Sequence, residues 1–490
     1  MRRRQVLLGA LGASAVATAG AAAVISSAHG RETEDRSRLF AHIADASKRT
    51  FSPAELRADL DDLCEALIDI CVAPFARTSR MDFEAHRARV AAGLNRSLDT
   101  FGFGLRVAPL FAGLQDGHIA IDLNDMMWQY ARDGGRVFPL QLEFTPNGTF
   151  VTQSAALGVP EGSRLLAVDG REAADLTATI LACTSAPTLP ARRQFASNVG
   201  STMAWMRAML GARDAFDVRY ESGGRILRSR VQALTQKEAV RRLTAGPIAP
   251  ATFRTLAAGS VGYLEYRRCE PGDALDRALH DAFSRAKAAG VRALVVDVRR
   301  NRGGSDSAND QVLNYLTSKP YVQGTRFSVR SSRRLKDKYG FFGYVQRYFA
   351  PSAWFAPEGS VITIDVAEIF ARTTPGGNAL RFDGPIDVLV GPGTFSSAMS
   401  FRSDGPRLRH RDARRRTAGR NARFERAGRH GAGAADVSGC GHWLEVFLSD
   451  ETSAAVCRLA PDLLVATRAA DTHAGRDPVL ATALTRARRH

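Results

Sequence analysis

Three short strings combine residue types suited to nucleophilic chemistry. The first, Val388-Leu-Val-Gly-Pro-Gly-Thr-Phe-Ser396-Ser397-Ala398-Met399, runs from an apolar strand pattern through a glycine turn to a serine where a helix should begin. A hydroxyl at a helix N-terminus lies beside free backbone N–H groups and the positive end of the helix dipole, which favour a developing oxyanion. Ser396 is therefore a candidate nucleophile, and a plain helix N-cap is the alternative interpretation.

The other two strings could supply an oxyanion hole and a base. Val296-Asp-Val-Arg-Arg-Asn-Arg-Gly303-Gly304 ends a buried strand in two glycines, which let the backbone approach a ligand and turn its N–H groups outward. A tight turn before the next helix fits the same glycines. Leu114-Gln-Asp116-Gly117-His118 places a histidine directly after an Asp-Gly turn, where it could act as a general base or be an ordinary surface histidine.

Taken together, the three strings resemble the tail-specific (C-terminal-processing) serine peptidase family. Asp297 to Gly304 is similar to the family's oxyanion segment, and Thr394-Phe-Ser396-Ser397-Ala398 is similar to its nucleophile segment. The Leu114 to His118 string resembles the tricorn-core-like branch, which uses histidine. The resemblance implies acyl transfer in which Ser396 attacks a peptide carbonyl, His118 takes its proton, and N–H groups of Gly303 or Gly304 with that of Ser397 hold the oxyanion. Ser397 stays open as an alternative nucleophile.

The absence of lysine separates two branches of that family. The better-known branch pairs its serine with a lysine about two dozen positions downstream, and this chain has no lysine after Lys338. A Ser/Lys pair of that kind is excluded, so His118 is the available base. The family's usual Gly-Glu-Pro-Thr-like turn, which carries a catalytic glutamate, has no counterpart here.

The patterns around these strings predict an α/β protein of several parts. The family implies a crotonase-like (ClpP/crotonase) core, and strands over 261–265, 293–298 and 386–390 alternate with helices over 274–289 and 307–317. Ser52-Pro53-Ala54-Glu55 is a capping box that opens a helix. Short strands and turns from Val137 to Arg230, with Gly162 to Gly170 among them, resemble a PDZ domain. The expected units are 1–28, an export signal; 29–130, helical; 135–245, PDZ-like; 250–401, the catalytic core; 402–441, an arginine-rich stretch; and 442–490, the end of the core.

The N-terminus predicts export from a bacterial cell. Arg2, Arg3 and Arg4 precede an apolar run and the small residues Ser26-Ser27-Ala28, and the arginine pair resembles a twin-arginine signal. An ordinary signal with extra arginines is the alternative. We therefore expect a periplasmic or extracellular protein without stable membrane insertion after signal removal.

Charge and cysteine usage argue against nucleic-acid and metal functions. The formal net charge is +17, but 11 arginines against three acids lie between Arg402 and Arg429, so the basicity is local. The six cysteines show no metal-binding spacing and no disulfide framework. We expect no cofactor, no metal and no nucleic-acid partner; the sequence leaves the oligomeric state open.

Residues 402–441 depart from the rest of the chain. They lack apolar periodicity, and arginine, glycine and alanine dominate. A solvated basic loop that binds an anionic surface is one interpretation. A pair of compensating frame errors is the other, because Arg415-Arg416-Thr417-Ala418-Gly419, encoded with GC-rich codons and read one base later, gives Gly-Glu-Pro-Pro. That second account would leave the chain without its catalytic acid and hence inactivated.

The sequence thus predicts an exported serine peptidase that cleaves polypeptides. The rival from another functional class is a non-catalytic protein that binds a peptide or ligand on the same scaffold.

Overall fold

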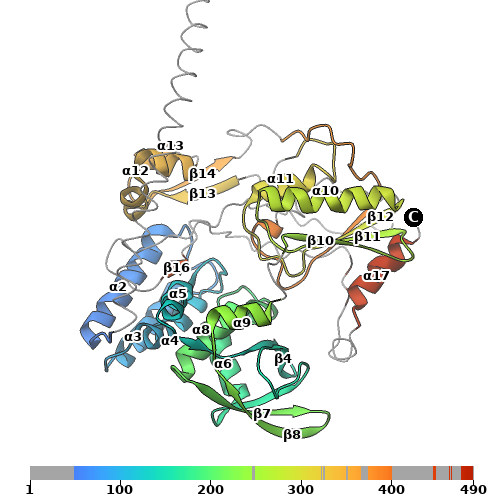
Figure 1. Cartoon of the computed structure of the whole chain (residues 1–490). Helices are drawn as coiled ribbons and strands as arrows, with labels where there is room; N and C mark the ends of the chain where they lie inside the picture. Colours follow the sequence, from blue (N-terminus) through green and yellow to red (C-terminus); the bar gives the residue numbers. More distant parts are fainter. Residues whose placement is uncertain are drawn as a thin grey trace, which may run out of the picture.

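The computed structural model describes residues 49–244, 249–321, 323, 326–348, 351–365, 373–399, 445–447, 463, 465 and 476–488. The predicted export signal and the arginine-rich stretch 402–441 lie outside these residues. The described chain is mixed α/β, which confirms the predicted class (Figure 1).

The N-terminal helices pack through one apolar face. α2 (Pro53–Ile70) begins at the predicted capping box, in which Ser52 and Glu55 exchange hydrogen bonds, and its leucines at helical spacing are buried. α3 (Arg80–Gly93), α4 (Thr100–Ala112) and α5 (Asn124–Arg132) complete the group. Between α4 and α5, β1 (Ala120–Asp122) pairs in antiparallel fashion with β16 (Glu445–Phe447), so a segment from the far end of the chain lies beside the start of the molecule.

The middle of the chain is built on a six-stranded antiparallel sheet. Its order is β3-β4-β5-β7-β8, with β6 beside β5. The sheet strands are β3 (Leu140–Thr145), β4 (Gly148–Ser154), β5 (Arg164–Val168), β6 (Arg171–Glu172), β7 (Ala215–Ser222) and β8 (Arg225–Gln232), and β2 (Arg136–Val137) pairs separately with β9 (Leu234–Thr235).

Helices also occupy this middle region, where the sequence predicted only strands and turns. α6 (Ala173–Cys183), α7 (Leu189–Ala196) and α8 (Val199–Leu210) lie between β6 and β7, and α9 (Gln236–Leu243) follows the sheet. The prediction of strands and turns alone was wrong for 173–210. One hydrophobic cluster runs through both the N-terminal helices and this sheet, with Phe111, Ile121, Phe138 and Met206 among its members.

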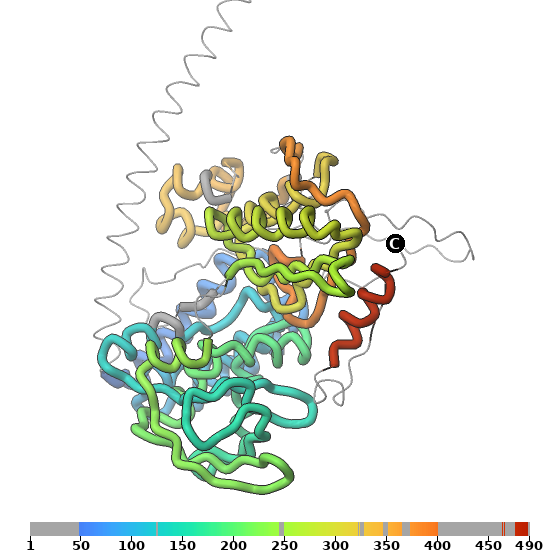
Figure 2. Tube along the Cα trace, turned by 45° about the vertical axis from the view of Figure 1, so that its right-hand side comes forward, coloured from blue at the N-terminus to red at the C-terminus, as the bar shows by residue number. Residues whose placement is uncertain are grey.

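The third region is a four-stranded sheet with the order β10-β11-β12-β15. β11 (Val261–Tyr266), β12 (Ala293–Asp297) and β15 (Ile386–Leu389) are parallel, and β10 (Ala251–Leu256) pairs with β11 in antiparallel fashion. α10 (Asp273–Ala288) and α11 (Asp306–Leu313) pack in one buried cluster with this sheet, and α17 (Pro478–Ala487) packs in another (Figure 2). The predicted strands and helices of this region are confirmed within a few residues.

A hairpin module joins the core to the N-terminal helices. β13 (Arg326–Arg330) and β14 (Val361–Asp365) form an antiparallel pair, with α12 (Arg333–Tyr348) and α13 (Pro351–Phe355) between them. Arg334 of α12 forms two hydrogen bonds with the carboxylate of Asp62 in α2, at 3.0 and 2.6 Å. In Figure 1 this module lies above α2 and to one side of the core sheet.

Among the described residues, no helix has both the length and the apolarity to cross a bilayer.

Candidate active site

The Ser396 turn follows the end of strand β15. Thr394 fixes it, because its hydroxyl donates to the carbonyl of Val298 at 2.8 Å and accepts the Gly391 N–H at 3.0 Å. Ser396 has a φ of +51°, a left-handed conformation that is costly for a residue with a side chain. The backbone becomes helical at Ser397. A strained serine between a strand and a helical turn is the geometry that presents a nucleophilic hydroxyl outward.

The two neighbouring serines differ in their surroundings. Ser397 is buried, and its hydroxyl donates to the carbonyl of Gly304 at 2.8 Å. Ser396 is partly exposed, and no hydrogen bond of its hydroxyl is recorded among the described residues. Ser397 therefore holds the glycine loop, while Ser396 has the accessible hydroxyl.

The two glycines predicted from the sequence lie against this serine turn. Gly303 has a φ of +93°, and a methyl group on it would lie 2.7 Å from both the Phe395 carbonyl oxygen and the Ser396 Cβ. Gly304 has a φ of +142°, and a methyl group there would lie 2.3 Å from the Cys269 carbonyl oxygen. Both positions need glycine because of close backbone approach and positive φ. The structure thus brings Gly303, Gly304, Ser396 and Ser397 together.

Two fully buried asparagines hold these backbone segments in place. Asn301 accepts the Gly303 N–H at 2.9 Å through Oδ1, and its backbone carbonyl accepts the Phe395 N–H at 3.0 Å. Asn309 donates from Nδ2 to the Ser397 carbonyl at 2.8 Å. Neither asparagine was predicted from the sequence to have a role in the site. A buried amide can bond to two backbone segments at once, which fixes the loop and the turn relative to each other.

Backbone N–H groups of the site are not all available. The Gly303 N–H is occupied by Asn301, whereas no hydrogen bond is recorded within the described chain for the N–H of Gly304 or of Ser397. Of the two glycines considered from the sequence, Gly304 thus has the N–H that could meet a ligand.

His118 lies on a closed turn that precedes β1. The Ile119 N–H donates to the Asp116 carbonyl at 3.0 Å, and the Ser185 hydroxyl donates to the same carbonyl at 2.6 Å. Oδ1 of Asp116 accepts the backbone N–H of His118 at 2.9 Å and lies 3.3 Å from the ring nitrogen Nδ1. Nε2 of His118 is buried and has no hydrogen-bond partner among the described residues.

Phe395 connects the histidine turn to the serine turn. Its ring centroid lies 4.4 Å from that of His118 and 5.2 Å from that of Phe195. A methyl group on Gly117 would lie 2.7 Å from the Phe395 ring, so the glycine lets the two turns touch. His118 is thereby packed against the residue that directly precedes Ser396, although no His118–Ser396 hydrogen bond is recorded among the described residues.

The carboxylate beside His118 is held in its charged form. Burial would raise the pKa of Asp116, but the hydrogen bond and the charge of the His118 ring, the His118 N–H and the charge of Arg77 together lower that pKa below its ordinary value. Asp116 is therefore an anion over the range in which proteins usually work.

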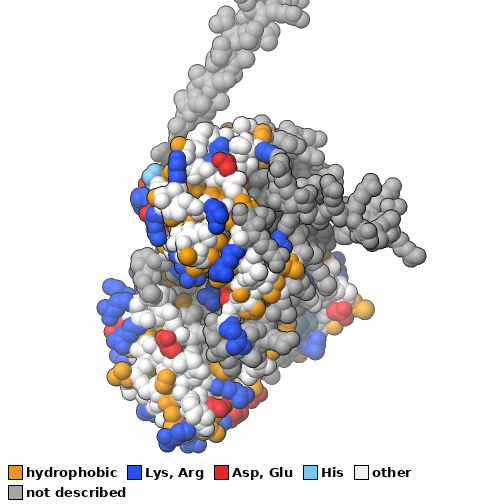
Figure 3. All heavy atoms as spheres, turned by 90° about the vertical axis from the view of Figure 1, so that its right-hand side faces the viewer, with side chains coloured by type: hydrophobic (Ala, Val, Ile, Leu, Met, Phe, Trp, Pro, Cys, Tyr) orange, Lys and Arg blue, Asp and Glu red, His pale blue; other side chains and the backbone are white. Residues whose placement is uncertain are grey.

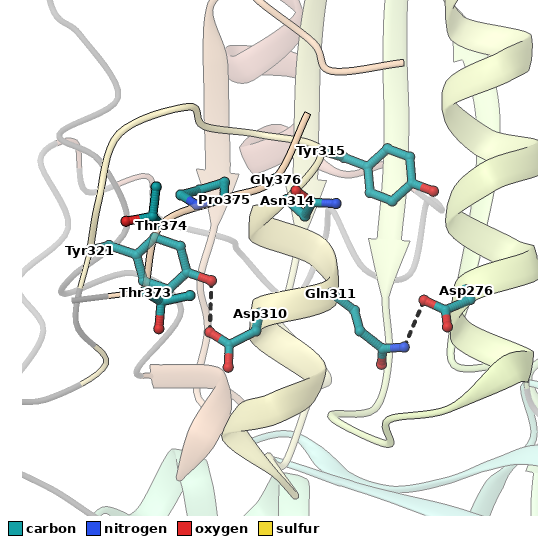
Figure 4. A pocket seen from close by; sticks show the side chains of 10 residues that line it. All are labelled: Asp276, Asp310, Gln311, Asn314, Tyr315, Tyr321, Thr373, Thr374, Pro375 and Gly376. Carbon is teal, nitrogen blue, oxygen red and sulfur yellow. Dashed lines mark hydrogen bonds between the residues drawn. The ribbon is translucent and has the colours of Figure 1, made fainter. Parts of the chain in front are cut away.

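A separate pocket lies beside the C-terminal half of α11. It has a volume of 370 Å³ and contains none of the predicted site residues (Figure 4). In it Tyr321 donates to Asp310 at 2.7 Å, and Gln311 donates to Asp276 at 2.7 Å. Across the described part of the chain, no group of three or more His, Cys, Asp or Glu side chains could hold a metal ion.

Comparison with known proteins identifies the core. The profile described as peptidase family S41 matches residues 260–404, which include both glycines and both serines of the site. The chain carries a peptidase family S41 domain. Residues 260–404 thus match a family of serine-type peptidases, which are hydrolases. Gly303, Gly304, Ser396 and Ser397 lie inside the S41 match, whereas His118 lies outside it, in the N-terminal region.

Solved structures give more distant likenesses. The photosystem II D1 C-terminal processing protease is 15% identical, with 71% of this chain and 77% of that chain covered and a TM-score of 0.33. Mature CPAF is 16% identical, with 71% and 80% covered and a TM-score of 0.41. A protein described as a peptidase from Parabacteroides merdae ATCC 43184 is 13% identical, with 72% and 71% covered and a TM-score of 0.33. No curated protein sequence matches the chain.

Proposed function

We propose that the chain is an exported serine peptidase that cleaves polypeptides by acyl transfer, with Ser396 as the nucleophile and His118 as the base. One observation carries the proposal: the His118 ring packs at 4.4 Å on Phe395, next to Ser396, and its Nε2 is buried with no partner among the described residues. This packing places the turn that carries His118 against the residue beside Ser396, which supports a shared site.

The chemistry follows from these groups. As the Ser396 Oγ bonds to the peptide carbonyl carbon, its proton passes to His118 Nε2. The C–N bond then breaks, and the leaving amine takes that proton from Nε2. Water then attacks the acyl-enzyme carbonyl while His118 takes its proton. The ester bond breaks, the carboxylate product leaves, and the proton returns to Ser396. No cofactor takes part.

We assign the oxyanion hole to the N–H groups of Gly304 and Ser397. The Gly303 N–H already donates to Asn301, which supports the Gly304 N–H over that of Gly303 as the donor. Gly303 is then the residue that lets the two backbone segments pack closely. The hydroxyl of Ser397 is already donated to Gly304, which supports Ser396 as the attacking serine. Apo hydrogen bonds at such sites tighten when substrate binds, so a direct His118–Ser396 bond is expected in the complex.

The finer architecture is also part of the proposal. Parallel strands β11, β12 and β15 with covering helices support a crotonase-like core over 250–401. The antiparallel sheet of 135–245 supports a PDZ-like region that captures the substrate chain along a strand edge. The histidine in Leu114 to His118 supports the tricorn-core-like branch.

A fluorophosphonate probe tests the proposal on protein expressed from a gene resequenced across codons 395–445. Wild-type protein should be labelled, Ser396→Ala should not, and His118→Ala should react about 10²–10⁴-fold more slowly. Ser397→Ala should keep labelling at a reduced rate, because only the hold on Gly304 is lost. Ser328→Ala, in the hairpin module, is the matched control.

A correctly sequenced, folded wild-type protein that does not react would overturn the peptidase proposal. The non-catalytic peptide- or ligand-binding protein on the same scaffold would then be the conclusion.

A further inference from the structure

The histidine turn contains a carboxylate that the proposed mechanism has not yet used. Asp116 lies two residues before His118, and its Oδ1 lies 2.9 Å from the backbone nitrogen and 3.3 Å from the ring Nδ1 of His118. The turn is closed by Ile119 at 3.0 Å and tied to the α6–α7 connection by Ser185 at 2.6 Å. The carboxylate therefore has a fixed position relative to the imidazole ring.

This geometry selects one tautomer of the ring. A carboxylate accepts hydrogen bonds, so the proton of a neutral His118 lies on Nδ1, and Nε2 carries the lone pair. Nε2 is buried and has no partner among the described residues. A buried acceptor without a donor is costly, and a catalytic role is one reason for such an atom to persist.

The ring has little freedom to turn away from this arrangement. The Phe395 ring packs against it at a tilt of 34°, with the ring centroids 4.4 Å apart, and Gly117 packs against Phe395. Asp116 also keeps its negative charge, because its contacts with His118 and the charge of Arg77 outweigh the effect of burial on its pKa. A fixed anion beside Nδ1 stabilises the imidazolium that forms when Nε2 takes the serine proton.

We propose that Asp116 is the positioning carboxylate of the base, so that acid and histidine come from one turn, Asp116-Gly117-His118. This inference rests on the proposed function of Ser396 and His118. Its consequence is specific: the peptidase does not need a carboxylate from residues 402–441, where the family resemblance would have placed one. The arginine-rich stretch then leaves the catalytic set complete.

The kinetic test compares Asp116→Asn with Asp116→Glu under fluorophosphonate labelling of the full chain. An asparagine amide can donate to Nδ1 and reverse the tautomer, so we expect the maximal labelling rate to fall ~10³–10⁴-fold with little change in the half-saturating probe concentration. Asp116→Glu should recover at least tenfold of that loss, since the carboxylate returns.

Two matched controls test whether the effect depends on the position of Asp116 or only on the loss of a negative charge. Asp169→Asn makes the same change at another aspartate that accepts a backbone N–H, from Asp217 at 2.8 Å, but on the six-stranded sheet. The second control replaces the four acids within 402–441 together, as Asp404→Asn, Asp412→Asn, Glu425→Gln and Asp436→Asn. Both proteins should be labelled within about threefold of wild type, a change of under 1 kcal/mol in barrier.

The ring tautomer gives a readout that needs no activity. In histidine-labelled wild-type protein, the ¹⁵N shifts of His118, assigned with His118→Ala, should report Nδ1–H for the neutral ring, and Asp116→Asn should move them toward Nε2–H. If Asp116→Asn does not fold, the wild-type spectrum still decides, because an Nε2–H ring would overturn the inference.

The outcomes separate this inference from the proposed function. Labelling that is lost in Ser396→Ala but unchanged in Asp116→Asn overturns only the role of Asp116. Labelling lost on replacing the four acids of 402–441 does the same. A folded wild-type protein without labelling overturns both.

Discussion

At the scale of single residues, Phe395 decides how the two halves of the site meet. Its ring contacts His118 on one side and Phe195 on another, and its backbone carbonyl and the next Cβ leave room only for hydrogen at Gly303. A displacement of this ring would move both His118 and the neighbouring Ser396. Misplacement of reacting groups by about 1 Å can cost about 10²-fold in rate.

Gly117→Ala is expected to impair labelling of Ser396 by about 10–10²-fold, because the added methyl group would lie 2.7 Å from the Phe395 ring. The loss should be in the maximal rate, measured with the fluorophosphonate probe. Gly93→Ala, where nothing lies within 4 Å of the added methyl group, is the control and should react like wild type. Equal rates for the two variants would show that Phe395 does not set the geometry.

The site residues that could be predicted from the sequence are those that need a positive φ or a close backbone contact. Gly303, Gly304 and Ser396 were found because glycine pairs and a serine after a strand leave a readable pattern, and the structure brings them together. From the sequence, Asp116 was predicted only as part of an Asp-Gly turn. Whether its carboxylate meets the histidine ring depends on side-chain torsions and on Phe395 packing from a distant segment, which no local pattern records.

At the scale of elements, Arg299 ties the end of β12 to the C-terminal helix. Its guanidinium contacts Asp297 and also Asp477, with NH1 at 2.9 Å from Oδ1 and NH2 at 2.7 Å from Oδ2 of Asp477. Asp477 also caps α17 by accepting the Leu480 N–H at 3.0 Å. Burial opposes the charge of Asp477, but these bonds outweigh it and lower its pKa. The glycine loop of the site begins directly after Arg299.

Asp477→Asn should lower the free energy of unfolding by about 1 kcal/mol at pH 7, since the cap is kept and the ion pair is lost. The pKa of Asp477 is lowered on folding, so its contribution is complete above the unfolded pKa, for which the ordinary value is 3.8, and is lost as pH falls through the folded pKa. Urea unfolding at pH 7 and near pH 3 measures this. A difference between wild type and variant that is equal at both pH values would contradict it.

The core elements were predictable, and the connecting ones were not. Strands β11, β12 and β15 are short apolar runs between glycines and helices, which is the pattern of buried parallel strands. α6 and α8 were missed because their alanine, threonine and methionine stretches lack a clear polar face, and α7 is only eight residues long. The β13–β14 pair joins Arg330 to Val361 across α12 and α13, and such a long-range pairing leaves no local signal.

At the scale of the whole molecule, the point of interest is how charged side chains are distributed on the surface. On the face in Figure 3, basic side chains are interspersed with acidic and apolar ones. Many of the arginines take part in ion pairs, as Arg219 does with Glu172 and Arg230 with Asp217. Isolated surface pairs of this kind contribute little stability. The net charge of +17 therefore affects the solubility of the protein and the partners it can bind more than it affects stability.

Replacing Arg3 and Arg4 together by lysine should block export, because a twin-arginine signal is read as a pair. The expected result is precursor retained in the cytoplasmic fraction, measured by immunoblotting of periplasm and cytoplasm. Arg2→Lys leaves the pair intact and should be exported normally. Export of the double variant at the wild-type level would instead favour an ordinary signal.

The ring contact between His118 and Phe395 joins positions that are far apart in the sequence. Contacts with such long sequence separation form late, after the local helices and hairpins of each region. A nascent or partly refolded polypeptide would therefore have Ser396 before His118 packs beside Phe395. Under the proposed function, reactivity toward a fluorophosphonate should therefore return only after the circular dichroism signal has recovered during refolding.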